Sequence, residues 1–225
     1  MRGTIIAHEV RTRGWALFNQ QGEPSAKFFN ALVPELFKEY PLEAKSHILR
    51  PYSESEAPPA SMSSLTGFAA QPLHTDGAHR PRPPRYILFR CLNPGEESCP
   101  TVVWTLDWHA LKRDWPADLA RNGWLIQPSA DTRFYGSVLE RESEGMHRIR
   151  FDMLCMAPPS GAGSVTTAVA CINRYAEVHS VTYAQDDCLL LDNWRVLHGR
   201  GEGAVFAKSR RLQRWASRGV KNGLG

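Results

Sequence analysis

Short apolar runs separated by polar turns recur along the chain, which is typical of β-strands. Residues 86–92 and 101–106 are short, apolar and rich in β-branched and aromatic side chains, and the turn Asn93-Pro94-Gly95 lies between them. They predict two adjacent strands. The run Cys188-Leu189-Leu190-Leu191 follows a polar turn and predicts a buried strand. Sheet is also predicted over residues 4–18, in which residues 14–18 would form an outer strand. A further strand is predicted over residues 147–154.

Helical spacing of apolar residues occurs in three places. They are residues 25–37, 108–119 and 168–178. Ser25 can cap the first helix, and Pro34 is expected to kink it. Asp107 can cap the second, whose tryptophans are expected to pack against the sheet. The pattern therefore predicts an α+β chain in which strands dominate and helices flank them.

Composition narrows the class of protein. At 225 residues the chain can bury one sizeable core, so residues 1–225 are expected to form a single domain. The balance of 27 basic against 23 acidic residues gives a net charge of only +4, which does not argue for nucleic acid. The basic stretch at residues 208–221 is either an anion-binding segment or a solvated strand edge and tail, and no aromatic stacking motif accompanies it.

The expected compartment is the cytoplasm. The N-terminus lacks a long apolar segment, and no run of eighteen apolar residues occurs, so neither a signal peptide nor a membrane helix is indicated. The five cysteines are odd in number and show no CxxC pairing, which predicts reduced thiols. No membrane or nucleic-acid partner is expected, and the sequence does not indicate an oligomeric state.

The most informative chemistry is His74-Thr75-Asp76, followed far downstream by His198. On an extended segment, residues i and i+2 point the same way, so His74 and Asp76 can converge on one ion. Two imidazoles and one carboxylate form the ligand set that leaves open positions on Fe(II) in non-haem oxygenases. His79 is the competing ligand, but it has no acidic partner at i+2.

Two further segments bear on this site. Residues 51–65 have the composition of a loop, and residues 61–71 are either a substrate lid or a surface connection. Beyond His198, Arg210 stands in the basic cluster at residues 209–215. A guanidinium matches the geometry of a carboxylate, so Arg210 can bind the far end of a chelating dicarboxylate.

Together these motifs resemble the taurine dioxygenase and clavaminate synthase-like family of Fe(II), 2-oxoglutarate-dependent oxygenases. The resemblance covers residues 73–215 and rests on four short matches. They are His74-x-Asp76, Asp192-Asn193, His198-Gly199-Arg200 and the pair Arg210 and Arg214. It implies a double-stranded β-helix, or jelly-roll, barrel with flanking helices.

The resemblance also implies roles for individual residues. Fe(II) would be held by three side chains, those of His74, Asp76 and His198. Arg210 would pair with the distal carboxylate of 2-oxoglutarate, assisted by Thr101. Arg200 would contact the carboxylate near the iron, and Arg214 would lie near the substrate or the co-substrate. Dioxygen would be the third reactant.

The implied activity is a dioxygenase that hydroxylates an unactivated C–H of a small polar metabolite, an amino acid or a derivative, and releases succinate and CO2. Desaturation, epoxidation or cyclisation would use the same oxidising chemistry and differ in substrate placement. Two readings from other classes stay open. One is a protein hydroxylase or demethylase, and the other is a non-catalytic metal-binding barrel, which would not need Arg210.

Overall fold

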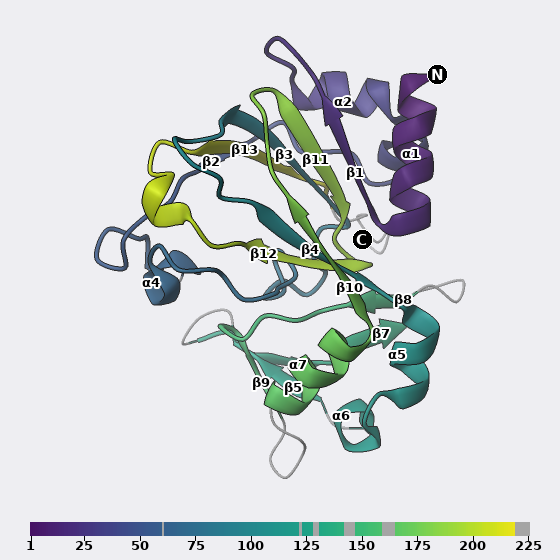
Figure 1. The fold of residues 1–225 in the computed structure, drawn as a ribbon. Helices are drawn as coiled ribbons and strands as arrows, with labels where there is room; N and C mark the ends of the chain where they lie inside the picture. Colours follow the sequence, from purple (N-terminus) through teal and green to yellow (C-terminus); the bar gives the residue numbers. More distant parts are fainter. Residues whose placement is uncertain (60, 122, 128–130, 142–146, 159–164, 219–225) are drawn as a thin grey trace.

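The computed structural model describes residues 1–59, 61–121, 123–127, 131–141, 147–158 and 165–218. Antiparallel strands dominate it (Figure 1). The largest sheet has five strands, in the order β1 (Trp15–Asn19), β11 (Asp187–Asp192), β3 (Tyr86–Asn93), β13 (Arg211–Ala216) and β2 (His47–Leu49). A second sheet has three, in the order β10 (Ala176–Val181), β4 (Thr101–Leu106) and β12 (Val196–Arg200).

These two sheets share a hydrophobic core. Ile87 and Leu189 of the large sheet pack with Val103 and Val196 of the small sheet. Successive residues of a strand point to opposite faces, so Leu88 and its neighbours face the other way. There they meet the helices α1 (Arg2–Arg13), α2 (Ala26–Leu32) and α3 (Pro34–Phe37), which cover that face in Figure 1. Because both faces of the large sheet are covered, apolar residues follow one another without alternation in β3 (residues 86–89) and β11 (residues 188–191).

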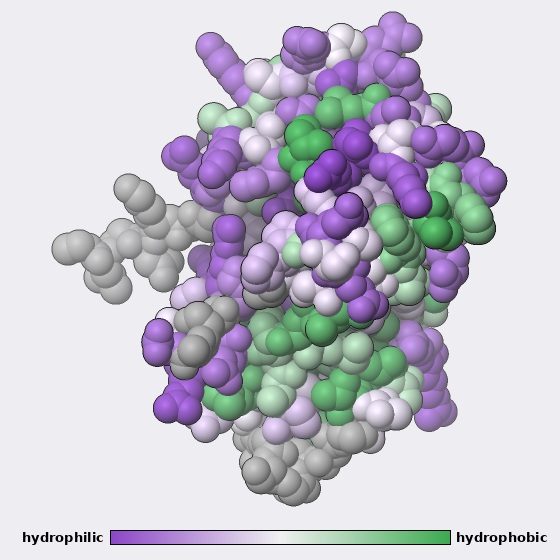
Figure 2. Space-filling view, turned by 90° about the vertical axis from the view of Figure 1, so that its left-hand side faces the viewer, coloured by the Kyte–Doolittle hydropathy of each residue, from purple (hydrophilic) through white to green (hydrophobic). Residues whose placement is uncertain are grey.

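A lower layer packs against the other face of the small sheet. It consists of β5 (Trp124–Ile126), β6 (Phe134–Gly136), β7 (Leu139–Arg141), β8 (His147–Ile149), β9 (Met156–Ala157), α5 (Trp108–Asp114), α6 (Ala117–Arg121) and α7 (Val165–Arg174). Leu106 and Leu197 of the small sheet share its core with Trp124 and Ile172. On the face shown in Figure 2, apolar groups gather over this lower part, and hydrophilic groups dominate above.

Several local predictions are confirmed. Ser25 caps α2 by accepting a hydrogen bond from the Phe28 N–H, and Asp107 caps α5 by accepting one from the Ala110 N–H. Pro34 does more than kink the first predicted helix, because it begins the separate helix α3. All five cysteines are free thiols.

The prediction of sheet over residues 4–18 is wrong for its first part. Residues 2–13 form the helix α1, whose buried residues are Gly3, Ile6, Ala7 and Val10, which is a helical spacing. Gly14 ends the helix in a left-handed conformation, with φ 87°, and only then does the edge strand β1 begin. The outer strand predicted at residues 14–18 is confirmed as β1.

The predicted pairing of residues 86–92 with 101–106 is also wrong. Both segments are strands, but β3 lies in the large sheet and β4 in the small one, so they face each other across the core. The strand predicted at 147–154 is limited to β8, and the helix predicted at 168–178 begins earlier and ends at Arg174, before β10. None of the helices in the described part of the chain has the length and apolar character needed to cross a bilayer.

Candidate metal centre

The backbones of His74 and His198 are paired directly. His198 lies in the middle of β12, and His74 forms an isolated antiparallel bridge with it. The His74 N–H donates to the His198 carbonyl at 2.9 Å, and the His198 N–H donates back at 3.1 Å. Gly199 allows this approach, because a Cβ there would lie 2.5 Å from the Gln71 carbonyl oxygen. Pairing therefore places the two imidazoles side by side, with ring centroids 4.6 Å apart.

Asp76 is held through its backbone by a buried amide. The Asn193 side chain accepts a hydrogen bond from the Asp76 N–H at 2.9 Å and donates to the Asp76 carbonyl at 3.0 Å. Thr75, which lies between the two potential ligands, is buried and turned away from them. Its hydroxyl donates to the Ile149 carbonyl and accepts from the Phe151 N–H, both at 3.2 Å. The alternation expected for an extended segment is therefore present.

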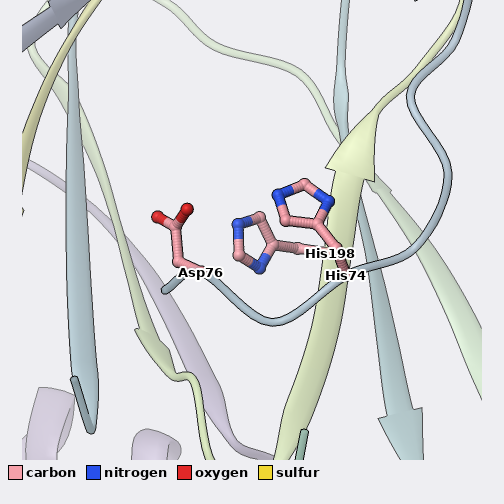
Figure 3. A group of neighbouring side chains, drawn as sticks. All are labelled: His74, Asp76 and His198. Carbon is pink, nitrogen blue, oxygen red and sulfur yellow. The ribbon is translucent and has the colours of Figure 1, made fainter. Parts of the chain in front are cut away.

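Figure 3 shows both imidazole rings and the Asp76 carboxylate directed toward a common space. One ligand atom from each of His74, Asp76 and His198 lies within 4.8 Å of the other two. In the described part of the chain, this is the group of histidine, cysteine and acidic side chains that could hold a metal ion. His79 is not a member of it.

The protonation states suit metal binding. Burial alone would raise the pKa of Asp76, but Arg214 and the two imidazoles outweigh it and lower that pKa to about 2. Arg214 Nη1 lies 3.1 Å from each carboxylate oxygen of Asp76. Burial lowers the pKa of His198 to about 3, with His74 acting in the same direction and Asp76 opposing. At neutral pH the carboxylate is therefore ionised and His198 is neutral, which are the forms that bind metals.

The hydrogen bonding of the two rings also fits a metal ion. His74 Nδ1 lies 3.0 Å from the Pro72 carbonyl oxygen. A carbonyl only accepts, so this nitrogen carries the proton and Nε2 is left with a lone pair. His198 Nδ1 is buried and has no hydrogen-bond partner among the described residues. The donor set of two imidazoles and one carboxylate suits Fe(II) and leaves coordination positions open.

A second polar cluster contains Arg210 and Thr101. Both are buried, and Arg210 Nη2 lies 3.4 Å from the Thr101 hydroxyl oxygen. Tyr183, to which no sequence motif points, donates its phenol hydrogen to the same oxygen at 2.9 Å. Burial raises the pKa of Tyr183 to about 12, although Arg210 opposes this, so the phenol stays neutral. The structure thus brings two of the expected co-substrate residues together and adds a third side chain.

Arg200 and Arg214 both contact other groups of the protein. Arg200 donates to the carbonyls of Gly67 and Ala69 and contacts the Ser63 hydroxyl at 3.4 Å. Its guanidinium therefore holds the segment 61–71, which contains the short helix α4 (Ser63–Thr66). Arg214 is paired with Asp76. Roles for these two arginines toward a co-substrate or substrate stay predictions.

A cavity of about 940 Å³ connects these groups. Its wall includes the three potential metal ligands together with Thr101 and Arg210. Residues of the segment 61–71 also line it, as does His79. Sequence reasoning missed further lining residues, namely His47, Arg50, Gln127 and Asp152. His47 is paired with Arg214 across β2 and β13, a contact that only the strand register reveals.

No protein-family model matches the sequence, and no curated protein matches it. Solved structures do match the fold. An asparagine oxygenase in complex with Fe(II), 2S,3S-3-hydroxyasparagine and succinate has a TM-score of 0.68 at 12% identity, covering 95% of this chain and 78% of that one. The non-heme iron oxygenase OrfP in complex with Fe and alpha-ketoglutaric acid has a TM-score of 0.68 at 16% identity, covering 98% and 80%.

OrfP in complex with Fe, succinate and (3S)-hydroxy-L-Arg has a TM-score of 0.65 at 18% identity, covering 98% of this chain and 79% of that one. At such low sequence identities, the similarity to these structures establishes the fold of this chain and nothing more. The chain has the mainly antiparallel sheet architecture of iron- and 2-oxoglutarate-dependent oxygenases, and it agrees with the resemblance found in the motifs.

His198→Ala should abolish binding of Mn(II) or anaerobic Fe(II), because it removes an imidazole that is neutral and already positioned. The loss should exceed the roughly 10- to 100-fold that follows removal of an outer hydrogen-bond partner. Isothermal titration calorimetry with Mn(II) measures it. His79→Ala is the matched control, since His79 lines the same cavity outside the ligand group, and it should bind Mn(II) as the wild type does. Equal weakening in both variants would contradict the assignment.

Proposed function

We propose that this protein is an Fe(II)- and 2-oxoglutarate-dependent dioxygenase. The observation that carries the proposal is the presence of two clusters in one cavity. One is a group of two histidines and an aspartate, and the other is a buried arginine beside a threonine hydroxyl. A non-catalytic metal-binding barrel would account for the first cluster but would have no use for the second.

In the first cluster, His74, Asp76 and His198 would hold Fe(II). At physiological pH His198 is neutral and Asp76 is ionised, so neither side chain has to lose a proton when the metal binds. Asn193 and Thr75 would keep the Asp76 backbone in place. Arg214 would hold whichever Asp76 oxygen does not face the ion.

In the second cluster, Arg210 would bind the far carboxylate of 2-oxoglutarate with its guanidinium fork. The hydroxyl oxygen of Thr101 accepts from both Tyr183 and Arg210, which uses its two lone pairs. Its own hydrogen is then free to point at a carboxylate oxygen in the cavity. Tyr183 would thus orient the threonine hydroxyl toward the co-substrate.

Fe(II) and 2-oxoglutarate, when bound, supply with O2 the oxidising chemistry that converts an unactivated C–H to C–OH, with succinate and CO2 as the other products. The protein supplies binding, orientation and protection from bulk water. Segment 61–71 borders the cavity and is held by Arg200, so we propose that it covers the substrate. Desaturation, epoxidation or cyclisation would place a different substrate bond at the same position.

We propose a small polar metabolite as substrate, with an amino acid or a derivative as the first class to test. The part of the cavity wall outside the two clusters carries both signs of charge, with Arg50 and Asp152 among its residues. Such a wall suits a substrate with an anionic and a cationic end. The matching structures hold hydroxyasparagine and hydroxy-L-Arg, which are amino-acid products.

For the fold, we propose that the two sheets form the double-stranded β-helix barrel of this enzyme class. Support comes from their shared core and from the bridge between His74 and β12, which extends the small sheet by one strand position. We further propose that residues 1–225 form one catalytic domain and that it works in the cytoplasm.

Arg210→Ala should weaken 2-oxoglutarate binding by about 10- to 100-fold, because one charge-assisted carboxylate contact contributes roughly 1.5 to 3 kcal/mol. The dissociation constant is measured anaerobically on the Mn(II)-loaded protein. Arg211→Ala is the control, since the Arg211 guanidinium binds the Lys208 and Arg210 carbonyls and does not line the cavity. An unchanged affinity in Arg210→Ala would show that Arg210 does not bind the far carboxylate, and the contact would then be assigned to another arginine.

Incubation with Fe(II), 2-oxoglutarate and O2 should produce succinate faster when a panel of polar amino acids contains the substrate. The matching product should gain one oxygen atom by mass spectrometry, whereas desaturation would appear as the loss of two hydrogens. His198→Ala provides the background rate. If no polar amino acid raises succinate formation above that of the enzyme without substrate, the amino-acid class is wrong.

A further inference from the structure

Arg150 is a buried cation outside both clusters, and no sequence motif points to it. Its side chain is 1% exposed. An ionised group is costly to bury unless charge and hydrogen bonds compensate for the lost water. Such a residue therefore calls for a specific set of partners.

All five N–H donors of the Arg150 guanidinium have an acceptor. Nε donates to Glu140 at 2.9 Å, and Nη2 reaches the second oxygen of the same carboxylate at 3.4 Å. The remaining three donors bind backbone carbonyls of one short loop. Nη1 binds those of Ala78 at 2.6 Å and Arg80 at 2.5 Å, and Nη2 binds that of Pro81 at 2.8 Å.

That loop follows Asp76 directly. The residue before Asp76, Thr75, is tied to the backbone of Ile149 and Phe151, which are the two chain neighbours of Arg150. One short segment, residues 149–151, therefore holds the chain on both sides of Asp76. Its backbone fixes the side before the carboxylate, and the Arg150 side chain fixes the side after it.

The same segment is anchored independently. The Ile149 N–H donates to the Trp194 carbonyl at 2.9 Å, and the Arg150 N–H donates to the Val138 carbonyl at 2.8 Å. Trp194 follows Asn193, the residue that binds the Asp76 backbone. The loop after Asp76 is thus tied through Arg150 to the turn that precedes the strand of His198.

We propose that Arg150 is a positioning residue for the metal centre: its guanidinium fixes the loop after Asp76 and so sets the direction in which the Asp76 carboxylate reaches the ion. The inference rests on the proposed metal site and adds a residue that touches neither metal nor substrate. Glu140 supplies the counter-charge that keeps the guanidinium in place. The same clamp orients His79, which stands between Ala78 and Arg80 and lines the cavity.

Arg150→Lys tests the proposal, because it keeps the positive charge opposite Glu140 but cannot bind three carbonyls and a carboxylate at once. Mn(II) affinity, measured by calorimetry without any turnover, should fall by about 10- to 100-fold. Arg148→Lys is the matched control. Arg148 comes from the same segment of chain and binds the same Glu140 carboxylate, and its replacement should leave Mn(II) affinity unchanged.

Amide hydrogen exchange separates positioning from general stability. In Arg150→Lys, exchange should rise in residues 77–80 while the core strand β11 stays protected. Loss of protection throughout β11 would make Arg150 a general folding residue and would overturn the proposal. Wild-type Mn(II) affinity in Arg150→Lys would also overturn it. Failure of the wild-type protein itself to bind Mn(II) would instead contradict the proposed function, and this inference with it.

Discussion

The candidate site depends on one antiparallel bridge, in which His74 and His198 exchange backbone hydrogen bonds. The bridge sets the spacing of the two imidazoles, and the alternation of an extended chain then directs Asp76 to the same side. A bulky residue at position 199 would not fit, because the Gln71 and Pro72 carbonyls lie against the Gly199 Cα. The rest of the fold supplies β12, the edge strand of the small sheet to which His74 pairs.

Buried arginines hold the loops around that bridge. Arg200 binds carbonyls of the segment before the metal motif, and Arg150 binds carbonyls of the loop after it. Loop carbonyls have no strand partner, and a guanidinium with five donors can satisfy several at once. Arg210 differs, since its guanidinium contacts a threonine hydroxyl on the cavity wall. Arg150 and Arg200 thus organise loops, whereas the role that we propose for Arg210 is to bind an anion.

The sequence was most informative about features that depend on the spacing of neighbouring residues. The caps Ser25 and Asp107 and the alternation around Thr75 follow from neighbouring residues. Residues 4–18 were misread because β-branched residues suggested strand, whereas burial of Ile6 and Val10 against the large sheet stabilises a helix. The partners of β3 and β4, and the contacts of Tyr183 and Arg150, join segments far apart in the chain. Such contacts depend on topology, which periodicity does not specify.

The most direct test of the account is an anaerobic titration of the protein with Fe(II) and then 2-oxoglutarate, followed by visible absorption. The account predicts that a weak charge-transfer band of the metal-bound keto acid grows and saturates with added 2-oxoglutarate. This readout needs no knowledge of the substrate, and it requires both clusters of the cavity to act together. Stoichiometric binding of Fe(II) without any such band would contradict the oxygenase assignment and favour a metal-binding protein without this activity.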